Sequence, residues 1–211
     1  MYHVWINIGG SMEPNNTKHN DVLCVAIEEF AHRGLVGTTM EAIARKANVS
    51  KRTLYKHYAN KQALFDNVVQ LLLSRIEQLQ NYHYRSDVAV YDQLKELARL
   101  SLALGSDQDY LTLSRIVIIE SMRDQQQAAR LEEKFLDCGK GLQGWFAQAH
   151  EAGILNDIPA DIAAAFFYGG LKKMAYWEQV IQWKPALDEE KIEQLIDLTS
   201  RFFISGIKLQ K

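Results

Sequence analysis

Basic and hydroxyl side chains gather in one short stretch of this 211-residue sequence, between positions 38 and 62. Six residues there are Lys or Arg and one, Glu41, is acidic, so the stretch has a balance of +5 against −2 for the whole chain. The rest of the chain therefore carries −7. A basic window on an acidic body is typical of a nucleic-acid-binding head, because Lys and Arg neutralise phosphates. A solvated charged face on an ordinary helical protein is the alternative interpretation.

The remaining candidates for chemistry are sparse. The six His residues are scattered without an HExxH-like pair, and no nucleophile elbow, phosphate loop, metal-ligand cluster or paired-carboxylate motif occurs. Cys24 and Cys138 match no metal or redox spacing, which favours free buried thiols in a reducing cytoplasm. No apolar run is long enough to span a membrane. We therefore expect a cytoplasmic protein that is not an enzyme and holds no metal or cofactor.

We expect the basic stretch to be carried by helices, because the proline distribution and the composition of the sequence both favour a helical fold. No proline falls between Pro14 and Pro159, and 47% hydrophobic with 24% charged residues excludes a disordered chain. The expected fold is all-α with about nine helices. Apolar spacing of three and four residues predicts them from Asn20 to Gly34, then near 40–47, 50–58, 60–76, 87–104, 108–123, 126–151, 160–182 and 188–206.

Residues 38–58 have the order short helix, tight turn, short helix, which is a helix-turn-helix. Thr38 or Thr39 can cap the first helix, Asn48 tolerates the left-handed conformation of a tight turn, and Ser50 can cap the second helix. Because the positive charge coincides with this geometry, DNA binding is favoured over a merely solvated face. The second helix is expected to bury Leu54 and Tyr58 and to expose Lys51, Arg52, Thr53, Lys56 and His57.

The same stretch resembles the TetR family of bacterial transcriptional regulators. The resemblance rests on FAHRG at 30–34, TTMEAIA at 38–44, ANVS at 47–50, TLYKHY at 53–58 and KQAL at 61–64. It covers about residues 20 to 65, and it departs from the family at Asn48, usually Gly, and at Tyr58, usually Phe. A weaker resemblance, carried by Leu113–Glu120 and the helices after it, is to the AefR-like subgroup.

The resemblance implies a division of the chain and a set of DNA contacts. It implies a three-helix DNA-binding domain at 17–65 and a helical ligand-binding and dimerisation domain at 66–211. The linker-like stretch Gly9–Ser11 separately predicts a disordered arm at 1–16. Arg52 is expected to contact a base and Lys61 a phosphate, whereas Tyr55 could equally belong to the core. The full set implied at DNA is Thr38, Thr39, Lys51, Arg52, Thr53, Tyr55, Lys56, His57 and Lys61.

Two helices near the C-terminus have apolar stripes, and the earlier helix is apolar on more than one side, which is wider than a monomer core requires. One side of each can face its own domain and the other side a second subunit, and an operator read by two heads also needs a homodimer. A plain monomer core is the alternative. The interface residues predicted from these stripes are Phe166, Gly170, Met174, Ile192, Leu195, Ile196, Thr199, Phe202 and Phe203.

Large side chains on the helices between 108 and 182 predict an apolar, aromatic-lined effector site. Any one of the aromatic residues could instead be core, and Glu120 could simply pair with Arg123 one turn on. Lys172 could likewise extend its ammonium to solvent. The predicted effector-site residues are Tyr110, Glu120, Met122, Trp145, Phe146, Phe167, Tyr168, Lys172 and Trp177.

The predicted function is a ligand-responsive DNA-binding transcriptional regulator, in particular a repressor released by a small apolar or aromatic effector. The expected partners are double-stranded operator DNA, an effector of unknown identity and a second copy of the chain, with no membrane partner. The alternative is a helical ligand-binding or interaction protein that does not bind an operator.

Overall fold

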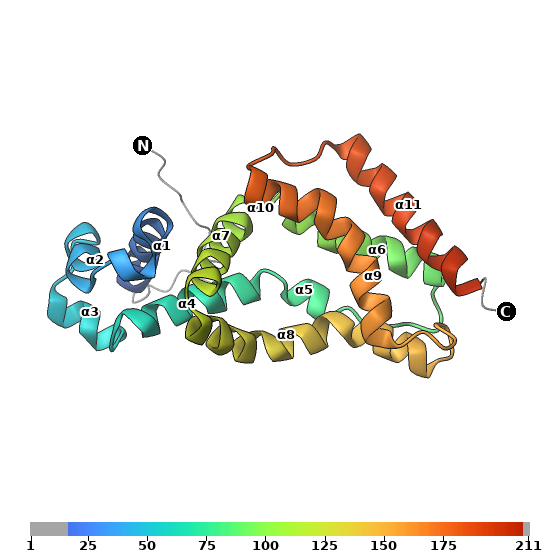
Figure 1. Ribbon diagram of the computed structural model, residues 1–211, viewed down its shortest axis with the longest axis horizontal. Coiled ribbons are helices and arrows are strands. Elements are labelled where there is room, and N and C mark those ends of the chain that lie inside the picture. Colours follow the sequence, from blue (N-terminus) through green and yellow to red (C-terminus); the bar gives the residue numbers. More distant parts are fainter. Residues whose placement is uncertain (1–16, 209–211) are drawn as a thin grey trace. The chain divides into compact units, whose positions relative to one another are not determined.

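The computed structural model describes residues 17–208, which contain helices and no strand (Figure 1). The predicted all-α fold is confirmed, and no helix in this range is long and apolar enough to cross a membrane. The α-helices are α1 Thr17–Gly37, α2 Met40–Lys46, α3 Lys51–His57, α4 Lys61–Ser74, α5 Glu77–Gln80, α6 Val90–Leu104, α7 Gln108–Arg123, α8 Gln125–Glu151, α9 Ala160–Lys172, α10 Glu178–Gln182 and α11 Glu189–Lys208, with a π-helical turn, η1 Lys173–Trp177, between α9 and α10.

Two compact units make up the chain. The first unit contains the residues up to Ser74 together with Thr112–Leu131, and the second contains Arg75–Leu111 and Glu132–Lys211. The boundary expected between residues 65 and 66 therefore falls inside α4. The arm expected at 1–16 lies outside the described residues.

In the first unit, α1 packs against α2 and α4, and α2 packs against α3. The apolar face of α1 is buried, and the ring of Phe30 meets that of Phe65 edge to face with 5.7 Å between centroids. The helical conformation of α1 is interrupted at Gly34, whose φ of +69° suits glycine. A Cβ there would lie 2.3 Å from Arg123 Nη1, which the long Arg123 side chain could avoid by shifting, so the positive φ is the main reason that a larger residue would be strained here.

In the second unit, α6 packs against α9 and α11 around an aromatic core. Phe146 lies 5.1 Å from the Trp145 ring and 5.6 Å from the Phe167 ring, and all three are at most 1% exposed. Trp145 Nε1 donates to buried Gln93 Oε1 at 3.0 Å. These three residues, which were predicted to line an effector site, lie in the core of the second unit, as the alternative for each of them allowed.

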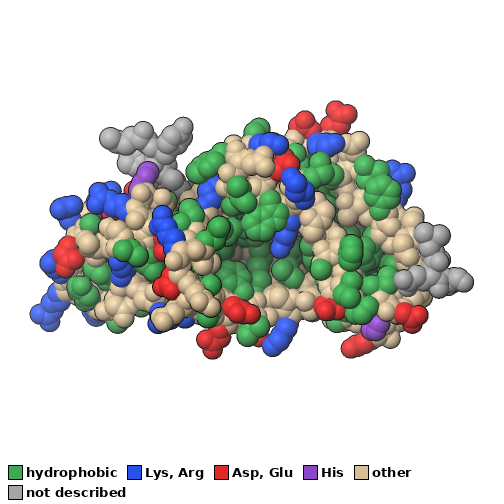
Figure 2. Space-filling model, in the orientation of Figure 1, with side chains coloured by type: hydrophobic (Ala, Val, Ile, Leu, Met, Phe, Trp, Pro, Cys, Tyr) green, Lys and Arg blue, Asp and Glu red, His purple; other side chains and the backbone are tan. Residues whose placement is uncertain are grey.

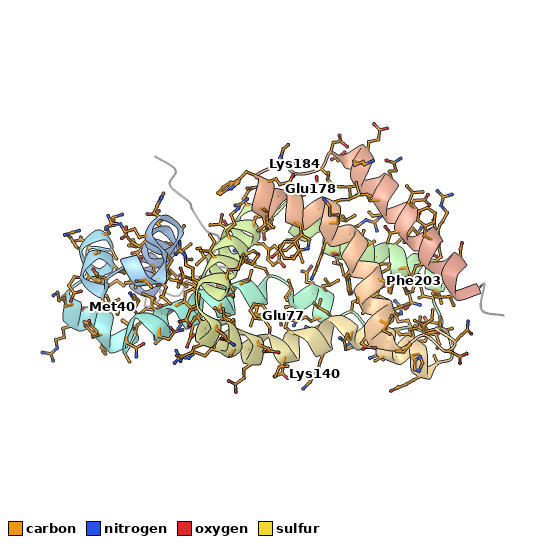
Figure 3. All side chains as sticks on the ribbon, viewed as in Figure 1. Met40, Glu77, Lys140, Glu178, Lys184 and Phe203 are labelled. Carbon is orange, nitrogen blue, oxygen red and sulfur yellow. The ribbon has the colours of Figure 1, made fainter. Side chains whose placement is uncertain are left out.

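The predicted helix over 160–182 is continuous but changes its hydrogen-bonding at Lys173–Trp177. At this π-helical turn the carbonyl of Ala175 comes so close to Gly105 that a Cβ on Gly105 would lie 1.7 Å from the oxygen. Glu178 follows the turn and accepts from Lys173 and Lys184, each at 2.8 Å (Figure 3). These two hydrogen bonds lower the pKa of Glu178 to about 2.

Within residues 17–208 there are ten helical runs where nine were predicted, because the run expected to end at Ile76 stops at Ser74 and α5 follows separately.

Candidate nucleic-acid interface and internal polar site

The expected helix-turn-helix is present, and each of its caps has an observed partner. Thr39 Oγ1 accepts from Ala42 N at 3.2 Å to begin α2, and Ser50 Oγ accepts from Thr53 N at 3.0 Å to begin α3. Asn48 has a φ of +51°, so the left-handed turn residue predicted from the sequence is confirmed.

The second helix of this motif, α3, turns one face to solvent. Leu54 and Tyr58 are buried as expected, and Thr53 is half-buried, with its hydroxyl 2.8 Å from that of Ser50. Tyr55, for which a core position was the alternative, is 46% exposed. Figure 2 shows blue side chains gathered on the first unit. The exposed polar side chains of α3 are Lys51, Arg52, Lys56 and His57.

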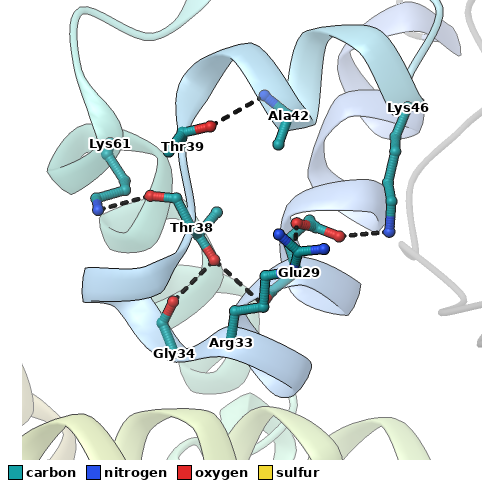
Figure 4. A network of polar contacts seen from close by, with 8 residues as sticks. All are labelled: Glu29, Arg33, Gly34, Thr38, Thr39, Ala42, Lys46 and Lys61. Atoms are coloured by element: carbon teal, nitrogen blue, oxygen red, sulfur yellow. Dashed lines mark hydrogen bonds and ion pairs between the residues drawn. The ribbon is translucent and has the colours of Figure 1, made fainter.

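Thr38 and Lys61 were both predicted to contact DNA, but the side chains of both form hydrogen bonds within the DNA-binding unit (Figure 4). Thr38 is 1% exposed, and its hydroxyl donates to Gly34 O at 2.8 Å and Glu29 O at 3.1 Å. This burial contradicts a DNA contact by the Thr38 side chain. Half-buried Lys61 donates from Nζ to Thr38 O at 2.7 Å and Val36 O at 3.2 Å, so it holds the chain that leads into α2.

A buried carboxylate that the sequence analysis missed ties α1 to α2. Glu29 is 1% exposed, forms an ion pair with Lys46 of α2, and lies 3.5 Å from Arg33 Nε (Figure 4). Since Lys46 neutralises Glu29, it contributes less to the free positive charge than the count alone suggests. Glu29 and Lys46 are 17 residues apart, so no local spacing indicates this pair; the spacing of four residues indicates only the contact between Glu29 and Arg33.

The third polar contact of the head joins its first and third helices. Tyr58 Oη lies 3.1 Å from Nδ1 of His19, and the two rings stack with centroids 5.2 Å apart. Burial raises the pKa of Tyr58 to about 12. Burial also lowers the pKa of His19, with a smaller contribution from His57.

Glu120, predicted at the effector site, instead binds the end of α1. Its Oε1 accepts from Leu35 N at 3.0 Å and from Arg123 Nη1 at 3.1 Å, and the residue is 4% exposed. The alternative of a pair with Arg123 is therefore confirmed, and the bond to Leu35 was not foreseen. Met122 is 83% exposed, which does not suit a residue that lines a cavity.

Two polar residues on α9, Tyr168 and Lys172, have few partners. Tyr168 is 6% exposed, yet its hydroxyl has no hydrogen-bond partner. Lys172 lies four residues on and is half-buried. Nearby, the half-buried Tyr110 ring lies 5.7 Å from that of Tyr176, while Trp177 is 40% exposed. Of the nine residues predicted for an effector site, Tyr168 and Lys172 are the two whose polar groups could still bind a ligand, because no hydrogen-bond partner within the described residues occupies them.

Comparisons with known proteins place both parts of the chain in one family. Residues 22–68 match the family described as bacterial regulatory proteins, tetR family. Residues 92–205, more than half of the chain, match the C-terminal domain of AefR-like transcriptional repressors. The chain belongs to the TetR family. It is a TetR-family transcriptional regulator with a helix-turn-helix head and an AefR-like helical domain.

Two curated relatives of this TetR-family chain are named as regulators. The uncharacterized HTH-type transcriptional regulator YhgD of Bacillus subtilis (strain 168) is 25% identical over 84% of this chain and 91% of its own length. The HTH-type transcriptional regulator RutR of Escherichia coli (strain K12) is 32% identical, but over 51% of this chain and 49% of its own length.

Solved structures of similar proteins share the fold. A TetR family transcriptional regulator from Pseudomonas syringae pv. tomato str. DC3000 superposes with a TM-score of 0.77 at 27% identity, covering 92% of this chain and 97% of that one. The Flavonoid-responsive Regulator FrrA has a TM-score of 0.68 at 27% identity, covering 90% and 96%.

The residues predicted for a dimer interface of this TetR-family regulator divide into three groups by exposure. Phe166 and Phe202 are 79% and 73% exposed, and Gly170 is also exposed. Leu195 and Ile196 are 8% and 1% exposed and belong to the core of their own unit, which contradicts their assignment to the interface. The half-buried residues are Met174, Ile192, Thr199 and Phe203. Ile162 of α9 is also exposed but was not among the residues predicted for the interface.

Proposed function

We propose that this TetR-family regulator binds operator DNA as a homodimer, represses transcription, and leaves the DNA when a small apolar or aromatic effector binds its C-terminal domain. The observation that carries the proposal is the capped helix-turn-helix, whose second helix exposes a basic face. Its named relatives are transcriptional regulators, which supports a protein without enzymatic activity.

The proposed DNA contacts lie on α3 and at the start of α2. Arg52 is the candidate for a base contact, because a guanidinium can bind the two acceptors of guanine. Contacts to phosphate fix the register of the head without reading sequence. The exposed candidates for phosphate are Lys51, Lys56, His57, Tyr55 and the Thr39 hydroxyl, with half-buried Lys61 beside them.

A homodimer is proposed from the exposed apolar residues of α9 and α11. Phe166 and Phe202 would expose large rings to water in a monomer, and covering them removes that apolar surface from solvent. A twofold dimer also supplies the two heads that an operator with two half-sites requires, about 34–36 Å apart.

The effector is proposed to be apolar or aromatic because the C-terminal domain is rich in such residues. The similar structure of the Flavonoid-responsive Regulator FrrA supports this class, because that protein responds to flavonoids, which are aromatic compounds. The effector must bind the two conformations of the dimer unequally, because equal binding shifts no population.

A mobility-shift assay on the DNA upstream of the gene tests the proposal. We expect the wild type and the Lys140→Ala control to shift this DNA, since Lys140 is exposed on α8 and outside the head. A true effector must then be bound more weakly when operator is present, by the same factor by which it weakens DNA binding. If no upstream DNA is shifted, the alternative of a helical ligand-binding protein is favoured.

A further inference from the structure

Tyr168 and Lys172 form an unsatisfied polar pair on one face of α9. Residues four apart on a helix are neighbours on its surface. Tyr168 is 6% exposed and its hydroxyl has no partner, and among the described residues the Lys172 ammonium has neither a hydrogen bond nor an ion pair. A buried polar group without a partner destabilises the fold, so the Tyr168 hydroxyl next to a half-buried ammonium calls for an explanation.

No acidic residue of the described chain balances Lys172. The ionisable group that affects it is the thiol of Cys138 on α8, which is itself 7% exposed. Burial lowers the pKa of Lys172, and the same burial raises the pKa of the Cys138 thiol. An ammonium held in an apolar setting without a counter-charge is suited to receive an anion from outside the protein.

The surroundings of this pair are apolar and locally irregular. The rings of Phe146 and Phe167 lie 5.7 and 5.4 Å from that of Tyr168. The helix changes to a π-helical turn at Lys173, directly after Lys172, and such turns are frequent at functional sites. A ligand bound here would therefore contact two polar donors and mainly hydrophobic side chains.

We propose that Tyr168 and Lys172 are the polar end of the effector site and that the effector is an apolar molecule with a carboxylate. One carboxylate oxygen would accept from the Tyr168 hydroxyl, and the carboxylate would pair with the Lys172 ammonium. Charge-assisted hydrogen bonds of this kind are the strong ones, and they would give the buried Tyr168 hydroxyl a partner and the Lys172 ammonium a counter-charge. This inference rests on the proposed function, because it identifies the chemical class of the effector.

The test uses the full-length protein and a panel of straight-chain monocarboxylates of six to sixteen carbons and aryl-alkyl monocarboxylates, each paired with its neutral primary amide. Binding is measured by the change in melting temperature and by calorimetry. We expect at least one acid to bind and its amide to bind at least tenfold more weakly. The proposal is overturned if no acid of the panel binds, or if the amides bind as tightly as the acids.

Variants separate a binding role from a structural role. Lys172→Met should weaken the acid at least tenfold and Tyr168→Phe several-fold, while Lys140→Met, at an exposed position of α8, should leave it unchanged. Without ligand, Lys172→Met and Tyr168→Phe should melt no lower than the wild type, because each removes an unsatisfied polar group. Unchanged acid affinity in Lys172→Met, or a clear loss of ligand-free stability in both variants, would contradict the proposal.

Operator DNA distinguishes this inference from the function on which it rests. If an acid binds through Lys172 but leaves DNA affinity unchanged, the site is established and the proposed effector-driven release fails. If a neutral apolar compound releases DNA equally from the wild type and from Lys172→Met, the proposed function holds and the carboxylate site is refuted.

Discussion

Replacing Glu120 by Ala should destabilise the first unit, because this carboxylate is the partner of a backbone amide 85 residues away. The Leu35 N–H donates to it at 3.0 Å, and Glu120 is 4% exposed, so water cannot readily replace it. A donor left without its acceptor costs about 1–3 kcal/mol, and bonds to charged groups lie at the upper end. The pair with Arg123 adds at most about 1 kcal/mol, since the Arg123 side chain is 57% exposed.

We therefore expect Glu120→Ala to lower the free energy of unfolding by about 2–4 kcal/mol, and Arg123→Ala by no more than about 1 kcal/mol. Urea denaturation at one fixed protein concentration measures both, because a dimer's stability depends on concentration. Hydrogen exchange measures the local effect: the Leu35 backbone amide should exchange at least about tenfold faster in Glu120→Ala than in the wild type. Equal costs for the two variants, or an unchanged Leu35 amide, would refute the assignment of Glu120 as the acceptor that holds the end of α1.

Three further predictions concern the dimer, the core and the head. Phe202→Glu places a charge on the exposed stripe of α11 and should sediment as a monomer; a stable dimer would mean that the interface lies elsewhere. Phe167→Ala leaves a cavity in a packed core and should cost about 3–5 kcal/mol by urea denaturation, whereas a loss below about 1 kcal/mol would indicate a ligand-lining position. Burial lowers the pKa of His19 in the folded protein from 6.5, so the unfolded chain binds the proton more readily and stability should fall as pH drops through about 6.5 towards the folded value. His19→Gln should lose less stability than the wild type between pH 7.5 and 5.5, and equal losses would contradict this role.

The helices could be predicted from the sequence because apolar spacing records which face of a helix is buried. The capped turn around Asn48 could be predicted as well, since its chemistry is local. Partners far apart in the chain could not: nothing in the sequence links Glu120 to Leu35 or Lys46 to Glu29. The pattern also marks burial without saying what covers a residue, so Phe146 was assigned to a ligand site and Ile196 to an interface although both lie in the core.

Side chains of the same type can also differ in solvent exposure for reasons that only the three-dimensional structure shows. Thr38 and Thr39 are adjacent, yet the first hydroxyl is buried against Gly34 O and the second caps α2 at the surface. The sequence identified both as candidates at DNA, and only the fold separates them. Tyr168, predicted as a large aromatic residue, and Lys172, predicted as a polar residue in apolar surroundings, show the opposite case: among the described residues, neither polar group has a hydrogen-bond partner after folding.

The central claim, that α3 reads operator DNA, is tested most directly by fluorescence anisotropy of wild type and Arg52→Ala on operator and on unrelated DNA over a range of salt. We expect the wild type to prefer its operator and to lose affinity with a log–log slope near −0.9 for each phosphate neutralised. Arg52→Ala should lose about 1–3 kcal/mol of this preference while its slope changes little, since a base contact carries sequence information and a phosphate contact does not. A variant with unchanged preference, or wild-type binding that is flat with salt, would contradict the claim.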